Sequence, residues 1–158
     1  FETYILNNAT DASSRRLAHL ENTVISHDSI RTPEEGDVAL ILRDLRLDAN
    51  VAESKRLACA IQKSLAAPSP ALVRPGLRLA RKRNRGVKQA LFHVLLGADM
   101  PSVLLEAGFL SSPNDRKLLL SGDGRRAIAA SIAHAIAQYR RLKGTPAASL
   151  ALSRCQVR

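Results

Sequence analysis

A short apolar run around residue 105 constrains the fold of this chain more than any other feature. Val103, Leu104 and Leu105 precede Glu106, and the apolar residues 107–110 follow it. A continuous run of this kind is typical of a strand buried on both faces, as in a parallel sheet. Because an unpaired charge inside such a strand costs several kcal/mol, either a partner compensates Glu106, or the strand ends there and opens onto a site.

Strand signals alternate with helical signals, which predicts an α/β fold with a mostly parallel or mixed sheet flanked by helices. The expected strands are residues 1–6, 92–96 and 102–105. Three strands make a narrow sheet for such apolar runs, so we expect further strands in a portion that precedes Phe1. We interpret residues 1–144 as part of one domain and residues 145–158 as a disordered tail.

Capping residues and apolar spacing predict the helices. Ser13 or Ser14 is expected to cap a short helix that ends near Leu20, with a loop over residues 21–31. Thr32 and Pro33 begin a second helix. The remaining helical signals are an amphipathic helix over 49–66, a restart at Ser112 and Pro113, and a long amphipathic helix from about Ile128 to Leu142, stopped by Gly144 and Pro146.

The chain is strongly basic, with a formal charge of +10 from 24 basic and 14 acidic residues. Such a surplus favours polyanions, and its strongest cluster is the stretch RLARKRNR, from Arg78 to Arg85. One interpretation is a binding module for nucleic acid or another polyanion. The other is a solvated face of an arginine-rich protein. Aromatic residues make up only 3% of the chain and none interrupts the cluster, which weakens the nucleic-acid interpretation.

The cysteines and histidines do not form a recognisable metal motif. Cys59 and Cys155 lie far apart, without a CxxC or Cys/His cluster, so a zinc finger is excluded and a disulfide remains open. The four histidines show no HxH or HxxxH spacing, and each is expected to be a packing or surface residue. They are His19, His27, His93 and His134.

Glu106 is the strongest candidate for chemistry. It ends the most apolar expected strand, and ligands of open α/β sheets bind beyond strand ends. Gly108 follows closely and could let the backbone turn or a substrate approach. Partial burial would raise the pKa of Glu106 and suit it to act as a general acid or base. The alternative is a structural glutamate paired with an arginine.

Several blocks of sequence, in order, resemble the zinc-dependent N-acetylmuramoyl-L-alanine amidases of the Amidase_3 type. The segment MPSVLLEAGFLSSP, residues 100–113, is similar to the family signature, with Ser112 in place of the usual Asn. The other similar blocks are FETYIL at 1–6, VAESKRLACAIQKSL at 51–65 and GVKQALFHVLLGADMP at 86–101. The resemblance covers about residues 1–142.

The resemblance implies a peptidoglycan hydrolase that cleaves the amide between N-acetylmuramic acid and L-alanine. In that family a single zinc ion activates water and a glutamate, which matches Glu106 here, acts as general acid/base. The zinc ligands of the family precede the strand that FETYIL resembles, so we expect them upstream of Phe1, and no residue of this chain inherits a ligand role. We therefore expect the 158-residue chain alone to be inactive.

The resemblance also implies a location outside the cytoplasmic membrane, in the periplasm, the extracellular space or the cell wall. The expected partner is peptidoglycan, without nucleic acid and without a transmembrane segment. Some family members carry a helical insertion that blocks the site until a protein activator binds. Residues 22–50 fall in the corresponding region, so residues 32–47 form either such a regulatory helix or an ordinary packing helix.

Overall fold

A computed structural model describes residues 1–7, 11–25, 37–72, 84–96, 98–145, 155 and 157. It is an α/β fold, as predicted: a three-stranded mixed sheet with α-helices on both faces. The strands are β1 (Glu2–Leu6), β2 (Val87–Ala90) and β3 (Leu104–Glu106), and the α-helices are α1 (Ala12–Ile25), α2 (Asp37–Ala66), α3 (Pro113–Leu120) and α4 (Gly122–Leu142). Two short 3₁₀ helices are η1 (Pro70–Leu72) and η2 (His93–Leu95).

The strand β1 is the centre of the sheet, whose order is β2-β1-β3. It pairs in parallel with β2, with Thr3 opposite Val87, and antiparallel with β3, with Glu2 opposite Glu106. All three residues of β3 are only partly buried. The expectation of a strand buried on both faces in a parallel environment is therefore wrong for β3, which is an antiparallel edge strand of the described sheet.

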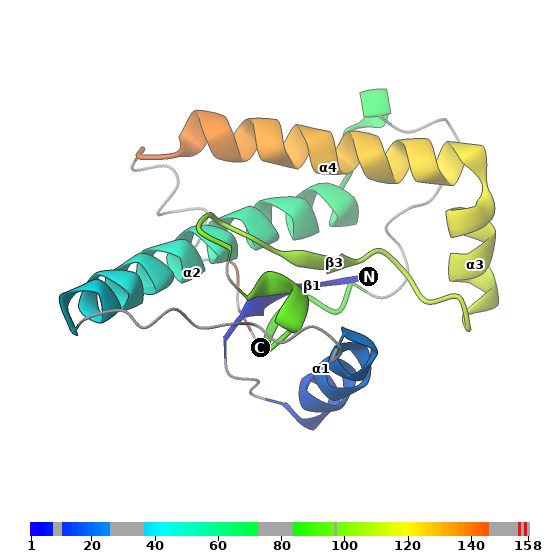
Figure 1. The fold of residues 1–158 in the computed structure, drawn as a ribbon. Coiled ribbons are helices and arrows are strands. Elements are labelled where there is room, and N and C mark those ends of the chain that lie inside the picture. The colour runs from blue at the N-terminus through cyan, green and yellow to red at the C-terminus, as the bar shows by residue number, and fades with distance from the viewer. Residues whose placement is uncertain are drawn as a thin grey trace.

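The two faces of the sheet carry separate cores. Helices α2 and α4 lie on one side of the sheet and α1 on the other (Figure 1). On the first side, the buried residues of β1 and β2 pack against α2 and α4. On the second, the Tyr4 ring packs edge-on against the Phe92 ring, with centroids 4.9 Å apart. The members are Phe1, Ile61, Leu65 and Ala135 together with Ile5, Ala58 and Val87 on the first face, and Tyr4, Ala18, Ala90, Phe92 and Leu95 on the second.

Three helical predictions need correction. Helix α1 continues to Ile25, so residues 21–25 are not a loop, and its N-terminus is capped by Asp11, which accepts a hydrogen bond of 2.9 Å from the Ser14 N–H. The two helices expected from 33 and from 49 are one continuous helix, α2. No Gly or Pro occurs between residues 37 and 66 to break it. The predicted start at Thr32 and Pro33 lies outside the described residues.

One predicted strand was also misplaced. Residues 92–96 are mainly the 3₁₀ helix η2, and the strand lies earlier, at β2. The apolar run FHVLL suggested a strand, but pairing with β1 selects the sequence VKQA, whose ends Val87 and Ala90 are buried. The predicted helix starts at Ser112 and Pro113 and the long C-terminal helix are confirmed by α3 and α4.

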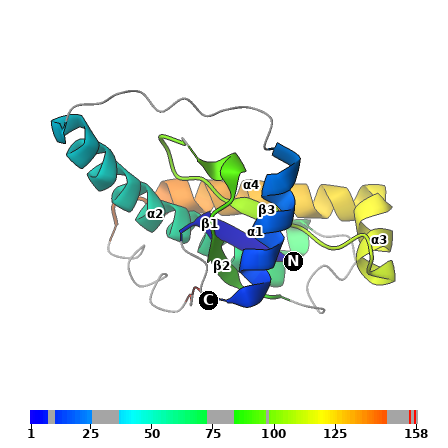
Figure 2. The same ribbon diagram turned by 60° about the horizontal axis from the view of Figure 1, so that its bottom comes forward.

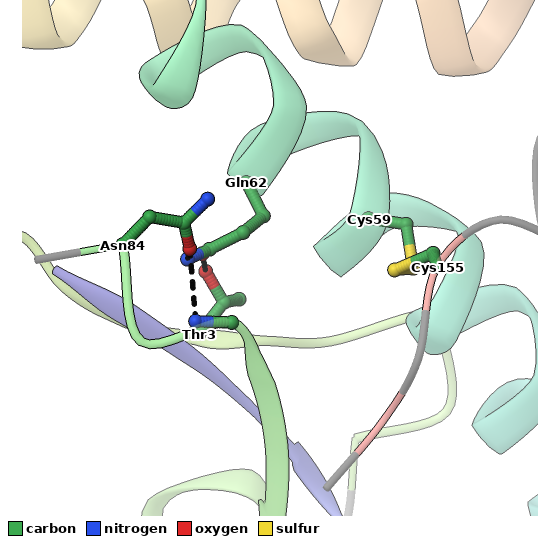
Figure 3. The surroundings of a disulfide bond; sticks show 6 residues. Thr3, Cys59, Gln62, Asn84 and Cys155 are labelled. Atoms are coloured by element: carbon green, nitrogen blue, oxygen red, sulfur yellow. Dashed lines mark hydrogen bonds between the residues drawn. A yellow bond between two sulfur atoms is a disulfide. The ribbon is translucent and has the colours of Figure 1, made fainter. Parts of the chain in front are cut away.

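Part of the tail is attached to the domain. Cys155 forms a disulfide with Cys59 of α2, across a sequence separation of 96 residues, and Val157 forms a parallel bridge with Val87 of β2. Figure 3 shows the disulfide beside α2. Residues 146–154, 156 and 158 lie outside the described part. In the described part, no helix is long and apolar enough to span a membrane.

Candidate active site

Strand alternation brings four polar side chains to one face of the sheet. Successive residues of a strand point to opposite faces, so Glu2 and Tyr4 of β1 share a face. The register adds Lys88, opposite Tyr4, and Glu106, opposite Glu2. This is the face covered by α1, which lies in front of the sheet in Figure 2. We call Glu2, Tyr4, Lys88 and Glu106 the carboxylate face.

Glu106 ends β3 and is half-buried. Burial raises its pKa, and the negative charges of Glu21 on α1 and of Glu2 raise it further. Among the described residues, no basic side chain forms an ion pair with it within 4.0 Å. The structure therefore gives Glu106 the partly desolvated setting expected from the sequence, without a described arginine partner.

Glu2 is the buried member of the carboxylate face, with 1% of its surface exposed. Its Oε2 lies 3.1 Å from the Nζ of Lys88, and its Oε1 lies 3.7 Å from an Nη of Arg85. A buried charge is tolerated only when it is paired, and these two cations provide the pairing. Sequence reasoning missed Glu2, although a glutamate inside the short strand ETYIL was a signal of the same kind as Glu106.

Tyr4 joins the same network. Its pKa is raised, first by burial and then by the charge of Glu2 and a hydrogen bond with it. A hydrogen bond with Ser14 acts in the opposite direction. Ser14, which is buried, in turn donates to Asp11 at the start of α1.

The loop after Glu106 is held from two sides. The Phe109 N–H donates to Asp115 of α3 at 3.2 Å, and the Arg85 guanidinium lies over the Phe109 ring, 4.6 Å from its centroid. A Cβ at Gly108 would lie 3.2 Å from the Cβ of Asp115. Gly108 thus permits close packing of the loop against α3, without a positive φ, and the close approach of a substrate there stays a prediction.

The basic cluster is described only at its end. Arg85, its last residue, faces Glu2 and Phe109, and residues 78–83 lie outside the described part of the chain. The binding-module interpretation of this cluster therefore stays a prediction.

The three histidines that the structure describes lie on helical elements. His19 is exposed on α1, His134 lies on α4, as expected, and His93 is exposed in η2 instead of in a strand. His27 lies outside the described residues. Within the described ranges, no group of three or more His, Cys, Asp or Glu side chains could hold a metal ion.

Comparison with known proteins gives this α/β domain a family. A family model described as N-acetylmuramoyl-L-alanine amidase, Amidase_3, matches residues 1–138, and the chain belongs to that family. It is 31% identical over 138 residues to N-acetylmuramoyl-L-alanine amidase AmiC of Neisseria meningitidis serogroup B, a match that covers 86% of this chain and 30% of that protein.

Two shorter matches agree with this family. The chain is 38% identical over 56 residues to N-acetylmuramoyl-L-alanine amidase AmiA of Escherichia coli strain K12, and 36% identical over 56 residues to the probable cell wall amidase LytH of Staphylococcus epidermidis. Each covers 35% of this chain and 19% of the relative. The chain thus spans less than a third of the length of these three relatives.

Proposed function

We propose that this chain is part of a peptidoglycan hydrolase that cleaves the amide between N-acetylmuramic acid and L-alanine, with Glu106 as the general acid/base. The family match over residues 1–138 supports the reaction class. The observation that carries the role of Glu106 is its half-buried carboxyl at the end of β3, with a raised pKa and no described ion-pair partner.

The proposed chemistry of Glu106 is proton transfer. Hydrolysis of an amide needs a group that removes a proton from the attacking water and delivers one to the leaving nitrogen. A carboxyl group does both most effectively when its pKa is closer to the working pH than that of an exposed glutamate. Burial and the two neighbouring carboxylates change the pKa of Glu106 in this direction.

The described residues do not fit a zinc site of their own. They contain no suitable group of three ligands, and Glu2, the buried carboxylate nearest in register to Glu106, is already paired with Lys88. Because the zinc ligands of the family precede the strand that FETYIL resembles, we propose that the ligands are contributed by polypeptide that precedes Phe1 and that residues 1–144 are one part of the catalytic domain. A bound zinc ion would supply the Lewis acidity that activates water.

We further propose that the protein acts on peptidoglycan in the periplasm, the extracellular space or the cell wall. Two named relatives are N-acetylmuramoyl-L-alanine amidases and one is a probable cell wall amidase. The Cys59–Cys155 disulfide also supports this location, because disulfides persist mainly in oxidising compartments. A protein activator acting through the region of residues 22–50 remains part of the proposal, and α2 begins within that region, at Asp37.

The role of Glu106 is tested by replacing it in the complete zinc-loaded protein. We expect Glu106→Gln to lower kcat for dye release from labelled peptidoglycan by roughly 10²- to 10⁴-fold, the usual contribution of a general acid/base. Asp99→Asn is the matched control, because Asp99 is exposed in the loop before β3 and should leave kcat unchanged. Equal activity of both variants would remove Glu106 from the mechanism.

The 158-residue chain itself gives a second prediction. Incubated with labelled peptidoglycan and added zinc, it should release no more dye than a sample without protein, because its described residues hold no set of metal ligands. Turnover that depends on Glu106 in this chain would show that the ligands lie within it.

A further inference from the structure

The pairing of β1 with β3 sets two carboxylates side by side. Glu2 and Glu106 are direct partners in the antiparallel register. Directly opposite residues in such a pair have Cβ atoms about 4.5–5.5 Å apart and point to the same face. Like charges in this position destabilise a sheet, so packing alone does not account for the arrangement.

Glu2 is fixed more firmly than Glu106. It is 1% exposed, and its two oxygens face Lys88 and Arg85. The Lys88 side chain is itself only 13% exposed. The Glu2 carboxylate is therefore held by the largely buried Lys88 and by the more exposed Arg85, whereas half-buried Glu106 has no described ion-pair partner.

Two charged groups act on Glu106, Glu21 from α1 and Glu2 from β1. Lys88 of β2 and Arg85 just before it face Glu2. Asp115 of α3 is occupied by the Phe109 N–H. Glu21 is exposed, so solvent screens its effect, whereas little solvent separates the buried Glu2 from its neighbours.

We propose that Glu2, held by Lys88 and directly opposite Glu106 in the register, is a positioning residue whose carboxylate favours the protonated form of the Glu106 carboxyl. The inference rests on the proposed function of Glu106 and deepens it. Glu2 acts only through Glu106 and does not need to contact the substrate. Removal of its charge should let Glu106 lose its proton at a lower pH.

The first experiment measures this coupling without activity. In the 158-residue chain, the side-chain carboxyl of Glu106 is followed by ¹³C NMR as pH is raised. We expect Glu2→Gln to lower the titration midpoint of Glu106 by about half to one pH unit, and Glu2→Asp, which keeps the charge, to restore most of it. Glu21→Gln is measured alongside, because Glu21 also raises the pKa of Glu106, and a shift confined to Glu21→Gln would overturn the proposal. An unchanged midpoint in Glu2→Gln would overturn the proposal.

Since Glu2→Gln leaves the buried Lys88 without its partner, the double variant Glu2→Gln/Lys88→Met is measured in parallel. It removes the pair together and replaces the buried cation with an apolar side chain of similar length. It should give the same downward shift if Glu2 is the source of the effect. A shift found only in the single variant would instead assign the effect to the unpaired lysine and overturn the proposal.

The second experiment uses the complete zinc-loaded protein and the pH profile of kcat/KM. Glu2→Gln should move the acid limb to lower pH by a similar amount, because that limb reports the free enzyme's base. Loss of activity in Glu106→Gln with an unmoved limb in Glu2→Gln would refute this inference and leave the proposed function intact. Full activity of Glu106→Gln would refute the proposed function, while the NMR midpoint would still decide the coupling.

Discussion

Glu106 lies in surroundings that favour its neutral form, because burial and the carboxylates of Glu21 and Glu2 all raise its pKa. The stability that such a group contributes is fully present below its unfolded-state pKa and is lost as pH rises through the higher folded-state pKa. Above that range, ionised Glu106 weakens the fold. A residue that is present although it lowers the stability of the fold is typical of a functional site.

Glu106→Gln should therefore stabilise the 158-residue chain at neutral pH. The amide has no charge to desolvate, so the thermal midpoint at pH 7 should exceed that of the unmodified chain. The difference should vanish near pH 3, well below the ordinary pKa of a glutamate, where Glu106 is protonated in both the folded and the unfolded states. Differential scanning calorimetry at the two pH values measures this. Asp99→Asn is the control, and an equal gain from it, or a gain from Glu106→Gln that persists near pH 3, would contradict the account.

The junction of α3 and α4 shows how one residue can serve two helices. Ser121 ends α3 and begins α4, and its Oγ donates to the Leu118 carbonyl at 2.9 Å and accepts the Gly124 N–H at 3.0 Å. The turn is so tight that a Cβ on Gly124 would lie 2.1 Å from the Leu118 carbonyl oxygen. The contact is with backbone, which cannot move aside without loss of the cap.

Gly124→Ala should destabilise the chain by about 1–3 kcal/mol, the usual cost of forcing an atom into a packed site. Gly122→Ala is a matched control two residues away, where the added Cβ would meet only Arg126 at 3.6 Å. It should be neutral or slightly stabilising, because Ala favours helix. Urea unfolding of both variants makes the comparison, and equal midpoints would show that the turn opens easily.

The elements that the sequence predicted well are those with strong local signals. Ser112 and Pro113 started α3 as expected, and β1 was found because FETYIL is strand-prone. The predicted position of the second strand, residues 92–96, is wrong because pairing with β1 determines the strand position more strongly than the apolar run does. The end of α1 differs from the prediction because residues 21–23 are polar, and Asn22 is held by long-range hydrogen bonds with the Leu91 carbonyl and the His93 N–H.

The site was predictable only in part for a related reason. Glu106 was visible as a carboxylate in an apolar run, and its raised pKa follows from burial. The position of Glu106 opposite Glu2 depends on the β1–β3 register, a long-range property that local sequence does not encode. The Cys59–Cys155 bond cannot be predicted from sequence, because spacing alone does not show that two cysteines meet.

At the scale of the whole molecule, the disulfide joins distant parts of the chain. Cys59 lies on α2 and Cys155 near the C-terminus, with Cα atoms 6.0 Å apart. Near this bond, Thr3 donates to Gln62 at 2.7 Å and Gln62 donates to Asn84 at 2.5 Å (Figure 3). Asn84 also accepts the Gly86 N–H, at the left-handed Gly86 (φ 83°) that leads into β2. Helix α2 therefore anchors β1, the start of β2 and the tail.

Reduction of the disulfide should lower the free energy of unfolding by about 4–5 kcal/mol, the chain-entropy value for a loop of roughly 100 residues. Guanidinium unfolding with and without dithiothreitol measures the change. The variant Cys59→Ser/Cys155→Ser should match the reduced protein and show no response to dithiothreitol. A midpoint that is the same in all four samples would mean that the bond is absent or contributes nothing.

The bridge between Val157 and Val87 has a consequence for how copies of this protein meet each other. An outer strand with unpaired amide and carbonyl groups can recruit a strand from a second molecule and start aggregation. Val157 of the tail pairs with Val87 of β2, and the Cys59–Cys155 disulfide holds this part of the tail in place. Oxidation would in this way protect solubility as well as stability.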